Sequence, residues 1–377
     1  MLTPSLYSIN PDRAKPWNDL PDLPIHPNLY RSIEVYEQLA WAKEALGRLQ
    51  GRSVAIPNQG LLINSISLQE AKASSAIENI FTTDDELYQA FSEATIEQAS
   101  ESTKEVLRYR EALWHGFEYL NRQPGFSTDY FVQVFQEIKQ SSEGIRPPFS
   151  QVYIRQGGSG SNVGKPVYTP PGGAGILEAK LNNLVQFLND DRAYPIDPLL
   201  KMAIGHYQFE AIHPFRDGNG RAGRVANIHL LTQKGLLDYP ILYLSRYIVE
   251  NKGDYYSTLA GVSQRGDWQS WLLYMLRAVT ETAQLTYEKI NRILAAQDAV
   301  LEEVATQKTI RRPDQLTQTI FTQPVTRVRH LTINKTYAEN TARDYLNRLT
   351  ELGILERKTV GGNHYYINRE LYSILAE

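Results

Sequence analysis

Hydrophobic residues recur at helical spacing along most of the chain after residue 30. Between residues 131 and 138, for example, apolar side chains stand at positions i, i+3, i+4 and i+7, which is the pattern of an amphipathic helix with one buried face. Similar patterns predict further helices over residues 30–50, 67–79, 106–120, 177–188, 197–212, 219–234 and 254–297. The protein is therefore predicted to be mainly α-helical.

Several residues mark the expected helix ends. Asp197 followed by Pro198 is typical of an N-cap residue and a first-turn proline. Ser67 with Glu70 three positions later matches a capping box, which places the start of a helix at residue 67. Gly51 is expected to end the first helix. These signals predict separate helices joined by short connections.

Two stretches break the helical pattern. Residues 150–172 contain two short β-prone pieces around a turn rich in glycine and serine, which predicts a hairpin. Residues 356–368 predict a second hairpin with a turn at Gly361 and Gly362, and this hairpin follows a predicted helix over residues 334–355. Helices followed by a hairpin are typical of a winged helix-turn-helix domain, which we expect over residues 308–377.

Charge is distributed unevenly along the chain, which has a net charge of −3. Residues 308–369 contain 11 lysines and arginines against 5 acidic residues, a balance of +6 that leaves 28 against 37, or −9, for the rest. A small basic domain on an acidic body suits contact with nucleic acid, so DNA is a possible partner of the C-terminal segment. A winged helix that only contacts other proteins, or that dimerises, is an equally open interpretation.

The composition excludes several classes of site. The sequence has no cysteine, which rules out disulfides, thiolate nucleophiles and cysteine metal sites. It has no apolar run long enough to span a bilayer. Residues 1–28 contain six prolines and no apolar signal core, and are expected to form an extended arm on a folded body. We expect a cytoplasmic protein without a membrane partner.

Residues 213–224, with the sequence HPFRDGNGRAGR, combine residue types that a structural loop does not need. Pro214 disfavours helix at His213, so one helix is expected to end there and another to begin near Asn219. Gly218 and Gly220 let the backbone turn tightly and approach a ligand. The free N–H groups of the new helix, with its dipole, form an anion site. This stretch therefore predicts a phosphate cradle.

The side chains around this cradle suggest a reaction. Arg221 and Arg224 lie three positions apart, and we expect both to point towards phosphate oxygens. Asp217 suits a Mg²⁺ ion that bridges two phosphates. The ordinary pKa of a histidine suits His213 to general-base work near neutral pH. Phe215 is expected to anchor the loop in the core.

The same stretch resembles the motif of the Fic-domain family, HxFx(D/E)GNGRxxR. The matching residues are His213, Phe215, Asp217, Gly218, Asn219, Gly220, Arg221 and Arg224. Upstream, Ser74, Glu78 and Asn79 match the family's inhibitory pattern, (S/T)xxxE(G/N). Residues 164–172 resemble its flap, and a winged-helix tail is common in the class. The resemblance covers roughly residues 20 to 370 and implies a Fic-type helical core with a hairpin flap.

The resemblance implies an activity, namely transfer of AMP from ATP to a Ser, Thr or Tyr hydroxyl of a protein. His213 would take the hydroxyl proton, the oxygen would attack the α-phosphate, and pyrophosphate would leave. Asp217 would hold Mg²⁺, and Arg224 would reach the γ-phosphate. The nucleotide-binding residues implied are Gly218, Asn219, Gly220, Arg221, Ala222, Gly223, Arg224 and Asn251, with Tyr255 as a further candidate.

Regulation and target docking also follow from the resemblance. Glu78, assisted by Ser74 and Asn79, would pair with Arg224 and occupy the arginine that the γ-phosphate needs. The flap residues Val167, Tyr168 and Thr169 would offer strand edges to a target segment. Glu78 could instead position a water molecule for AMP removal, and the sequence leaves both roles open. Family members are often dimeric, so a homodimer is expected.

The expected domains are an N-terminal region over residues 1–105 with the inhibitory helix at about 67–80, a catalytic core over 106–295 with the flap at about 150–172, and the winged helix over 308–377. Two alternative functions remain open. One is the same fold transferring another group, such as UMP or phosphocholine. The other is a DNA-binding regulator whose core senses a nucleotide.

Overall fold

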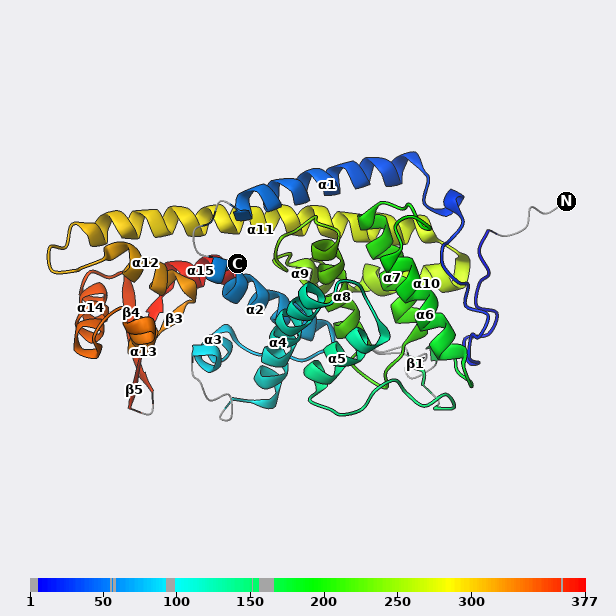
Figure 1. Cartoon of the computed structure of the whole chain (residues 1–377), viewed down its shortest axis with the longest axis horizontal. Coiled ribbons are helices and arrows are strands. Elements are labelled where there is room, and N and C mark those ends of the chain that lie inside the picture. Colours follow the sequence, from blue (N-terminus) through cyan, green and yellow to red (C-terminus); the bar gives the residue numbers. More distant parts are fainter. Residues whose placement is uncertain are drawn as a thin grey trace.

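The computed structural model describes residues 6–54, 56, 59–92, 99–150, 152–155, 166–360 and 362–377. The described helices are α1 (Ile33–Val54), α2 (Gln59–Ile77), α3 (Asp84–Ser92), α4 (Glu101–Arg122), α5 (Thr128–Lys139), α6 (Ile176–Asn189), α7 (Pro198–Ile212), α8 (Asn219–Gln233), α9 (Leu244–Glu250), α10 (Lys252–Arg265), α11 (Trp268–Ala305), α12 (Pro313–Thr322), α13 (Val328–Thr332), α14 (Glu339–Glu351) and α15 (Arg369–Ala376). Short 3₁₀ turns occur at Pro27–Leu29 and Ile333–Lys335. The described strands are β1 (Ile154–Arg155), β2 (Pro166–Tyr168), β3 (Val325–Thr326), β4 (Leu355–Val360) and β5 (Asn363–Asn368). The protein is mainly helical, as the sequence predicts (Figure 1).

Helix α7 lies at the centre of the core. Every residue from Leu199 to Ile212 is buried, because neighbouring helices, among them α6, α8 and α11, cover it on all sides. Its start matches the sequence prediction, since the side chain of Asp197 accepts a hydrogen bond from the backbone N–H of Leu199 at 3.0 Å and Pro198 occupies the first turn. Helix α8 packs on α7, so the loop between them is held by two buried helices.

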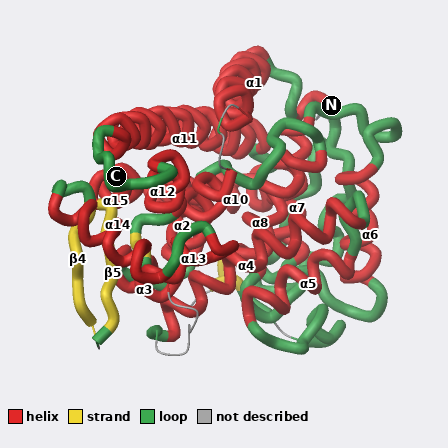
Figure 2. Tube along the Cα trace, turned by 60° about the vertical axis from the view of Figure 1, so that its left-hand side comes forward, coloured by secondary structure: helices red, strands yellow, loops and turns green. Residues whose placement is uncertain are grey.

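The C-terminal part of the chain contains a three-stranded antiparallel sheet in the order β3-β5-β4, together with helices α12 to α15. The predicted hairpin is confirmed as β4 and β5, which project at the end of the molecule opposite the N-terminus (Figure 2). Gly362 has a φ of 81° at the turn, whereas Gly361 lies outside the described residues. On α14 the buried residues Ala342, Leu346 and Leu349 face this sheet and its neighbouring helices, as their spacing predicts.

Helix α11 belongs to both halves of the molecule. It packs along α1 and against α7 and α10, and it also contacts α12 and α15 (Figure 1). Near its middle the buried ammonium group of Lys289 donates hydrogen bonds to the carbonyls of Ile374 (2.7 Å) and Leu375 (3.2 Å). These are the last carbonyls of α15, so a cation meets the negative end of a helix. The tail is therefore fixed to the core.

The N-terminal arm lies on the folded body, as the sequence predicts. Its side chains Trp17, Leu20 and Leu23 are buried, and the backbone N–H of Asn10 donates to the carbonyl of Ser263 at 2.8 Å. Apolar residues spaced through a proline-rich segment are thus enough to attach it without regular structure.

Two predicted helix ends are wrong. Helix α1 continues through Gly51 to Val54, and α2 begins at Gln59, so Ser67 and Glu70 are buried within it. The carboxylate of Glu70 does not cap α2. It accepts hydrogen bonds from the backbone N–H and hydroxyl of Ser245, at 2.8 and 2.5 Å, and from the hydroxyl of Tyr109. The local capping pattern is overridden because other helices offer Glu70 stronger partners.

Among the described residues, no helix is both long enough and apolar enough to cross a bilayer. The helices that are long, such as α11, carry many charged residues.

Candidate active site

His213 ends α7 in the left-handed conformation, with a φ of 51°. Its ring atom Nδ1 lies 3.3 Å from the backbone carbonyl of Glu210. A carbonyl can only accept a hydrogen bond, so this contact places the ring hydrogen on Nδ1 and leaves the lone pair on Nε2. Burial lowers the pKa of His213 to about 4. The imidazole is therefore neutral at pH 7, in the form that a general base needs.

The loop after His213 is fixed at both ends. Arg146 donates from Nε to the carbonyl of His213 at 2.8 Å. The ring of Phe215 stacks on Phe135 with centroids 4.2 Å apart, which is the anchoring role predicted for it. The side-chain amide of Asn219 is also used by the loop, since it accepts from the N–H of Phe215 and donates to its carbonyl, both at 2.8 Å. Only the backbone of Asn219 is left for a ligand.

The first turn of α8 has the uncapped start that the predicted anion site requires. Gly218 precedes the helix with a φ of 77°, a conformation that favours glycine, and no side chain caps the helix. The N–H groups at the start of α8 are thus available to an anion. The N–H of Ala222, however, already donates to the carbonyl of Gly218 at 3.0 Å, and the side chain of Ala222 is fully buried. The amide cradle therefore ends before Ala222.

The two motif arginines, both expected to point towards phosphate oxygens, take different partners in this structure. Arg221 forms an ion pair with Glu105 of α4. Arg224 donates from Nε to the hydroxyl of Ser74 at 2.8 Å, and from Nη2 to the carbonyl of Ser74 at 3.0 Å and to Oε1 of Glu78 at 2.9 Å. Both guanidinium groups are buried. Arg224 is thus held by α2 and by Glu78, which follows the helix end.

Two of the three predicted inhibitory residues, Ser74 and Glu78, contact this arginine. Burial opposes ionisation of Glu78, but the charge and hydrogen bond of Arg224 hold its pKa below the ordinary value. Asn79, with a φ of 62°, turns the chain after Glu78, and its side-chain oxygen accepts from Lys252 at 3.1 Å. The Glu78–Arg224 pair is therefore an ionised pair at neutral pH.

Asp217 has the chemistry of a metal ligand shared with phosphates. Its Oδ1 accepts from the N–H of Gly218 at 2.7 Å, and its Oδ2 pairs with the ammonium group of Lys139 at 2.7 Å. Burial opposes ionisation, but the hydrogen bond and charge of Lys139 keep the pKa of Asp217 low. The described residues contain no cluster of three or more histidines and carboxylates. One exposed carboxylate beside an anion cradle fits a Mg²⁺ ion whose other ligands are phosphate oxygens and water.

The flap is a short antiparallel pair, β1 with β2, in which Ile154 lies opposite Tyr168. Its predicted tip, residues 156–165, lies outside the described residues. Val167 is partly buried. Tyr168 is buried and donates to the carbonyl of Ala211 at 3.0 Å, and Thr169 is buried as well. The side chains of Tyr168 and Thr169 therefore fix the flap to the core.

The N-terminal arm already occupies part of the flap edge. The N–H of Trp17 donates to the carbonyl of Thr169 at 3.1 Å, and the hydroxyl of Thr169 donates to the carbonyl of Arg13 at 2.6 Å. The ring of Trp17 packs edge-on against Tyr168, with centroids 6.0 Å apart. At Thr169, the backbone carbonyl that a target strand could have used is paired within the chain.

Three family models match the chain, and each match falls on one of the regions described above. The Fic/DOC family N-terminal model covers residues 36–118, the Fic/DOC family model covers residues 132–231, and a model for the C-terminal domain of SoFic-like protein adenylyltransferases covers residues 298–371. The chain belongs to the Fic/DOC family. The second match contains the whole motif from His213 to Arg224.

Curated relatives of this Fic chain are named protein adenylyltransferases. One is fic-1 of Caenorhabditis elegans, 33% identical over 110 residues, which are 29% of this chain and 20% of the relative. Another is Fic of Aedes aegypti, 31% identical over 136 residues, or 36% of this chain and 23% of the relative. The similarity thus spans about a fifth of the length of these relatives.

Solved structures share the Fic fold. A Fic family protein from Desulfovibrio desulfuricans G20 superposes with a TM-score of 0.57 at 19% identity, over 92% of this chain and 98% of that one. Fic-1 from Caenorhabditis elegans gives a TM-score of 0.52 at 21% identity, over 69% and 74% of the two chains. At these identities the likeness establishes the fold alone.

Asn251 and Tyr255 are the two residues expected at the adenosine. In the part of the chain that the structure describes, neither forms a hydrogen bond with a residue of the Fic motif. The side-chain amide of Asn251 donates to the carbonyl of Tyr247 at 3.0 Å, within its own helix junction. Tyr255 is buried, and its hydroxyl lies 2.9 Å from Nε2 of His206. Both therefore have partners that serve the packing of the core.

Several residues of the Fic site were not predicted from the sequence. Glu105 and Lys139 come from α4 and α5, and no local pattern links them to the motif. Glu210 could have been noticed, because it lies one turn before His213 on the same helix. Burial raises its pKa to about 8, so its carboxyl group is protonated at pH 7.

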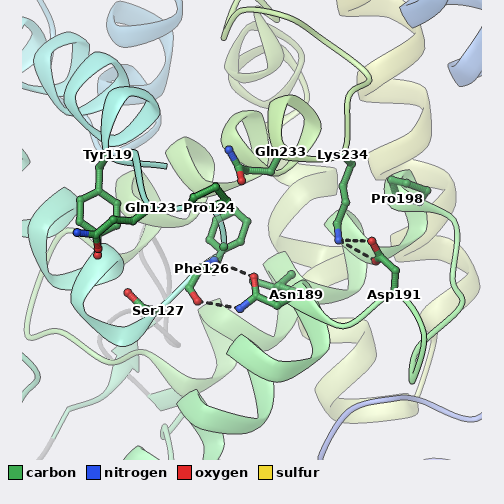
Figure 3. A pocket seen from close by; sticks show the side chains of 12 residues that line it. Tyr119, Gln123, Pro124, Phe126, Ser127, Asn189, Asp191, Pro198, Gln233 and Lys234 are labelled. Carbon is green, nitrogen blue, oxygen red and sulfur yellow. Dashed lines mark hydrogen bonds and ion pairs between the residues drawn. The ribbon is translucent and has the colours of Figure 1, made fainter. Parts of the chain in front are cut away.

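A separate cleft of about 810 Å³ lies at the far end of the Fic core, between the ends of α4, α6 and α8 (Figure 3). Asn189 closes one side by bonding both backbone groups of Phe126 at 2.8 Å, and Lys234 pairs with Asp191. Pro198, at the start of α7, lines this cleft, whereas His213 follows the end of that 15-residue helix, which is about 22 Å long. The cleft is therefore not part of the motif site.

Proposed function

We propose that this chain is a protein adenylyltransferase that transfers AMP from ATP to a Ser, Thr or Tyr hydroxyl of a protein, including itself. The observation that carries the proposal is the pairing of a half-buried, neutral His213 with the uncapped start of α8 across one fixed loop. Transfer of a phosphate-borne group to a hydroxyl requires a base for the hydroxyl proton and an anion site for the phosphates. Here both parts face one short loop. The names of the relatives agree with this activity.

In the proposed reaction, Nε2 of His213 accepts the proton of the target hydroxyl. The hydroxyl oxygen forms a bond to the α-phosphorus of ATP, the bond to the pyrophosphate oxygen breaks, and pyrophosphate leaves with the electron pair. The N–H groups at the start of α8 and the helix dipole stabilise charge on the phosphate oxygens. Asp217 would hold Mg²⁺, which neutralises charge between neighbouring phosphates when it is bound.

We assign the nucleotide to residues 219–221 through their backbone, to Gly218 through the tight turn that its φ of 77° makes, and to Arg224 through its side chain. Gly223 contributes by its lack of a side chain, because a Cβ there would lie 2.7 Å from Oε1 of Glu210. Asn251 remains a proposed contact to the adenosine. ATP is the proposed substrate.

The resting state is proposed to be autoinhibited. Arg224 would bind the γ-phosphate, but Glu78 and Ser74 use its donors in this conformation. ATP bound beside an engaged Glu78 would lack this contact and would be misplaced for in-line attack. Removal of the Glu78 carboxylate would free the side of Arg224 that Glu78 occupies, while Ser74 still holds the guanidinium group, and would leave His213 undisturbed.

The C-terminal segment is proposed to be a winged helix-turn-helix domain over residues 308–377, after an N-terminal region over 1–105 and a catalytic core over 106–295. Its sheet order, β3-β5-β4, with α12 to α14 beside it, supports this assignment. DNA stays a predicted partner on the strength of the net charge of +6 over residues 308–369. A homodimer and a cytoplasmic location also stay predictions.

Intact-protein mass spectrometry after incubation with Mg-ATP tests the proposed activity. We expect a strong AMP adduct on Glu78→Gly, a weak one on the wild type and none on His213→Ala. An adduct on Glu78→Gly with UTP or CDP-choline but not with ATP would overturn the substrate. Loss of an AMP adduct from the wild type but not from Glu78→Gly would assign AMP removal to Glu78. If no variant is labelled by any donor, the nucleotide-sensing regulator is the better account.

A further inference from the structure

Helix α3 is attached to the inhibitory helix α2 along one side. Asp84 accepts from the ammonium group of Lys72 at 2.6 Å and from the side-chain amide of Gln69 at 3.2 Å. Gln69 also bonds the hydroxyl of Tyr88. Glu78 lies in the short connection between α2 and α3, so any movement of α3 acts directly on the segment that holds Arg224.

The other side of α3 is held by the C-terminal segment. Oδ1 of Asp85 accepts from the hydroxyl of Tyr372 on α15 at 2.8 Å, and Oδ2 accepts from Lys358 on β4 at 3.4 Å. The ring of Tyr88 meets the ring of Tyr372 at 66°, with centroids 5.6 Å apart. Arg329, close to the sheet, donates to the carbonyl of Ser92 at the end of α3. Residues far apart in the sequence thus converge on α3 (Figure 1).

We propose that the C-terminal segment, residues 308–377, acts as a clamp that keeps the inhibitory segment on Arg224 by holding α3. When this clamp releases α3, Glu78 withdraws from Arg224 and the rate of adenylyltransfer rises. This inference rests on the proposed function and adds the element that controls it.

The contacts of the clamp with α3 are weaker than its contact with α11, so the clamp is expected to separate from α3 first. The Lys358–Asp85 pair is exposed on both sides, with side chains 49% and 63% accessible, so its contribution is small. A cleft of about 420 Å³, lined by Asp85, Lys358 and Tyr372 among others, leaves this junction loosely packed. The contact of α15 with α11, by contrast, uses the buried Lys289. The tail can therefore leave α3 while it stays attached to α11.

The inhibitory helix is likewise held firmly near its middle and less firmly at its C-terminal end. Glu70, buried in the middle of α2, is bonded to Ser245 at the start of α9 and to Tyr109 of α4. Beyond it, the chain from Ser74 to Asp84 is held by Arg224 and α3, and by single bonds from Asn79 to Lys252 and from Thr82 to Thr103 of α4. Helix α4 holds α3 too, since the N–H of Ser100 donates to Glu86 at 3.0 Å. Helices α2 and α4 thus hold α3 together with the clamp.

The experiment is a double variant, Asp85→Ala with Tyr372→Phe, in the full chain, made both with Glu78 and with Glu78→Gly. Loss of hydrogen bonds to a charged group predicts that the rate of AMP incorporation rises about five- to tenfold with Glu78 present. With Glu78→Gly the double variant should add nothing, because the element that the clamp holds is gone. Arg343→Ala, which breaks an exposed ion pair with Glu339 on α14, is the control and should leave the rate unchanged.

Hydrogen exchange on the same proteins measures how firmly the clamp holds the inhibitory segment, independently of catalysis. Amides of residues 75–83 should exchange faster in the double variant than in the wild type or in Arg343→Ala. An active Glu78→Gly, together with a double variant that keeps the wild-type rate and exchange, would overturn the clamp. An inactive Glu78→Gly would overturn the proposed function instead. The exchange rates alone would then test the clamp: faster exchange of residues 75–83 in the double variant would support it, and unchanged exchange would overturn it.

Discussion

Oε1 of Glu78 lies 2.5 Å from the point at which a side chain on Gly220 would begin. Nη1 of Arg224 lies 2.9 Å from the same point, so the ion pair sits directly against the bare backbone of α8. Any other residue at position 220 would push the pair away. The glycine proposed to let a phosphate approach the helix is therefore also the one that admits the carboxylate of Glu78.

Ser74→Ala is expected to weaken the hold of α2 on Arg224. The serine hydroxyl accepts from Nε of Arg224, and its loss leaves a buried guanidinium N–H without a partner, at a cost of roughly 1–3 kcal/mol. Urea unfolding should show this loss, and AMP labelling should rise above the wild type but stay below Glu78→Gly. Ser75→Ala is the matched control, since Oγ of Ser75 is buried with no hydrogen-bond partner among the described residues. Equal losses for both serines would contradict the assignment.

The pH dependence of adenylyltransfer should reflect the low pKa of His213. Because burial lowers this pKa to about 4, the neutral base form persists at all pH values above that. The rate of Glu78→Gly at saturating Mg-ATP should therefore stay level between pH 8 and about 5.5, whereas an unperturbed histidine would lose activity around pH 6.5. A fall centred near pH 6.5 would show that the ring is more exposed to water than the structure indicates.

Glu210 should make the protein less stable as the pH rises. Burial raises its pKa in the folded state to about 8, while the carboxyl group in the unfolded chain keeps the ordinary pKa of 4.5. The folded state therefore binds more protons between these values, and the stability that protonation contributes below pH 4.5 is lost as the pH passes through 8. The loss has an upper limit of about 1.4 kcal/mol per pH unit in this window.

Urea unfolding of the wild type and Glu210→Gln at pH 5 and pH 8 measures this effect. Glutamine does not titrate, so the variant should lose less stability than the wild type between the two pH values. Glu70, whose pKa burial raises to about 7, is present in both proteins and cancels in the comparison. Parallel curves would mean that Glu210 is ionised in the folded state.

Trp17→Ala is expected to detach the N-terminal arm from the flap. The buried ring packs against Tyr7 and Tyr168, and its removal should cost roughly 3–5 kcal/mol. Trp41→Ala provides the control, because Trp41 is 57% exposed and its removal should change stability by about 0.5 kcal/mol or less. Similar effects of the two changes would show that the arm does not pack as described.

The parts of the site that the sequence predicts are those encoded over short distances. Residues 213–224 specify their own loop, because Pro214, Gly218 and the start of α8 act on the backbone next to them. The helix start at Asp197 is predictable for the same reason, whereas the anchoring of Phe215 on the distant Phe135 follows from its apolar ring within a polar stretch. Motif residues with local partners can be placed from sequence alone.

The rest depends on partners from distant helices. Arg221 turns to Glu105, 116 positions away, and Asp217 turns to Lys139, 78 positions away. The capping pattern at Ser67 fails because Glu70 finds Ser245 and Tyr109 in the folded core. Spacing along one helix gives the direction of a side chain, but not which of several nearby charges it meets.

The continuity of α11 sets a fixed length within the molecule. Its 38 residues form one helix of about 57 Å, which begins beside the core and ends beside the tail. An unbroken helix of this length keeps the distance between the tail and the catalytic core nearly constant. A protein bound by the tail would therefore be held at a fixed distance from the candidate active site. For the proposed adenylyltransfer, the choice of target would then depend on distance as well as on sequence, since only hydroxyl groups at that distance would experience the raised local concentration of the site.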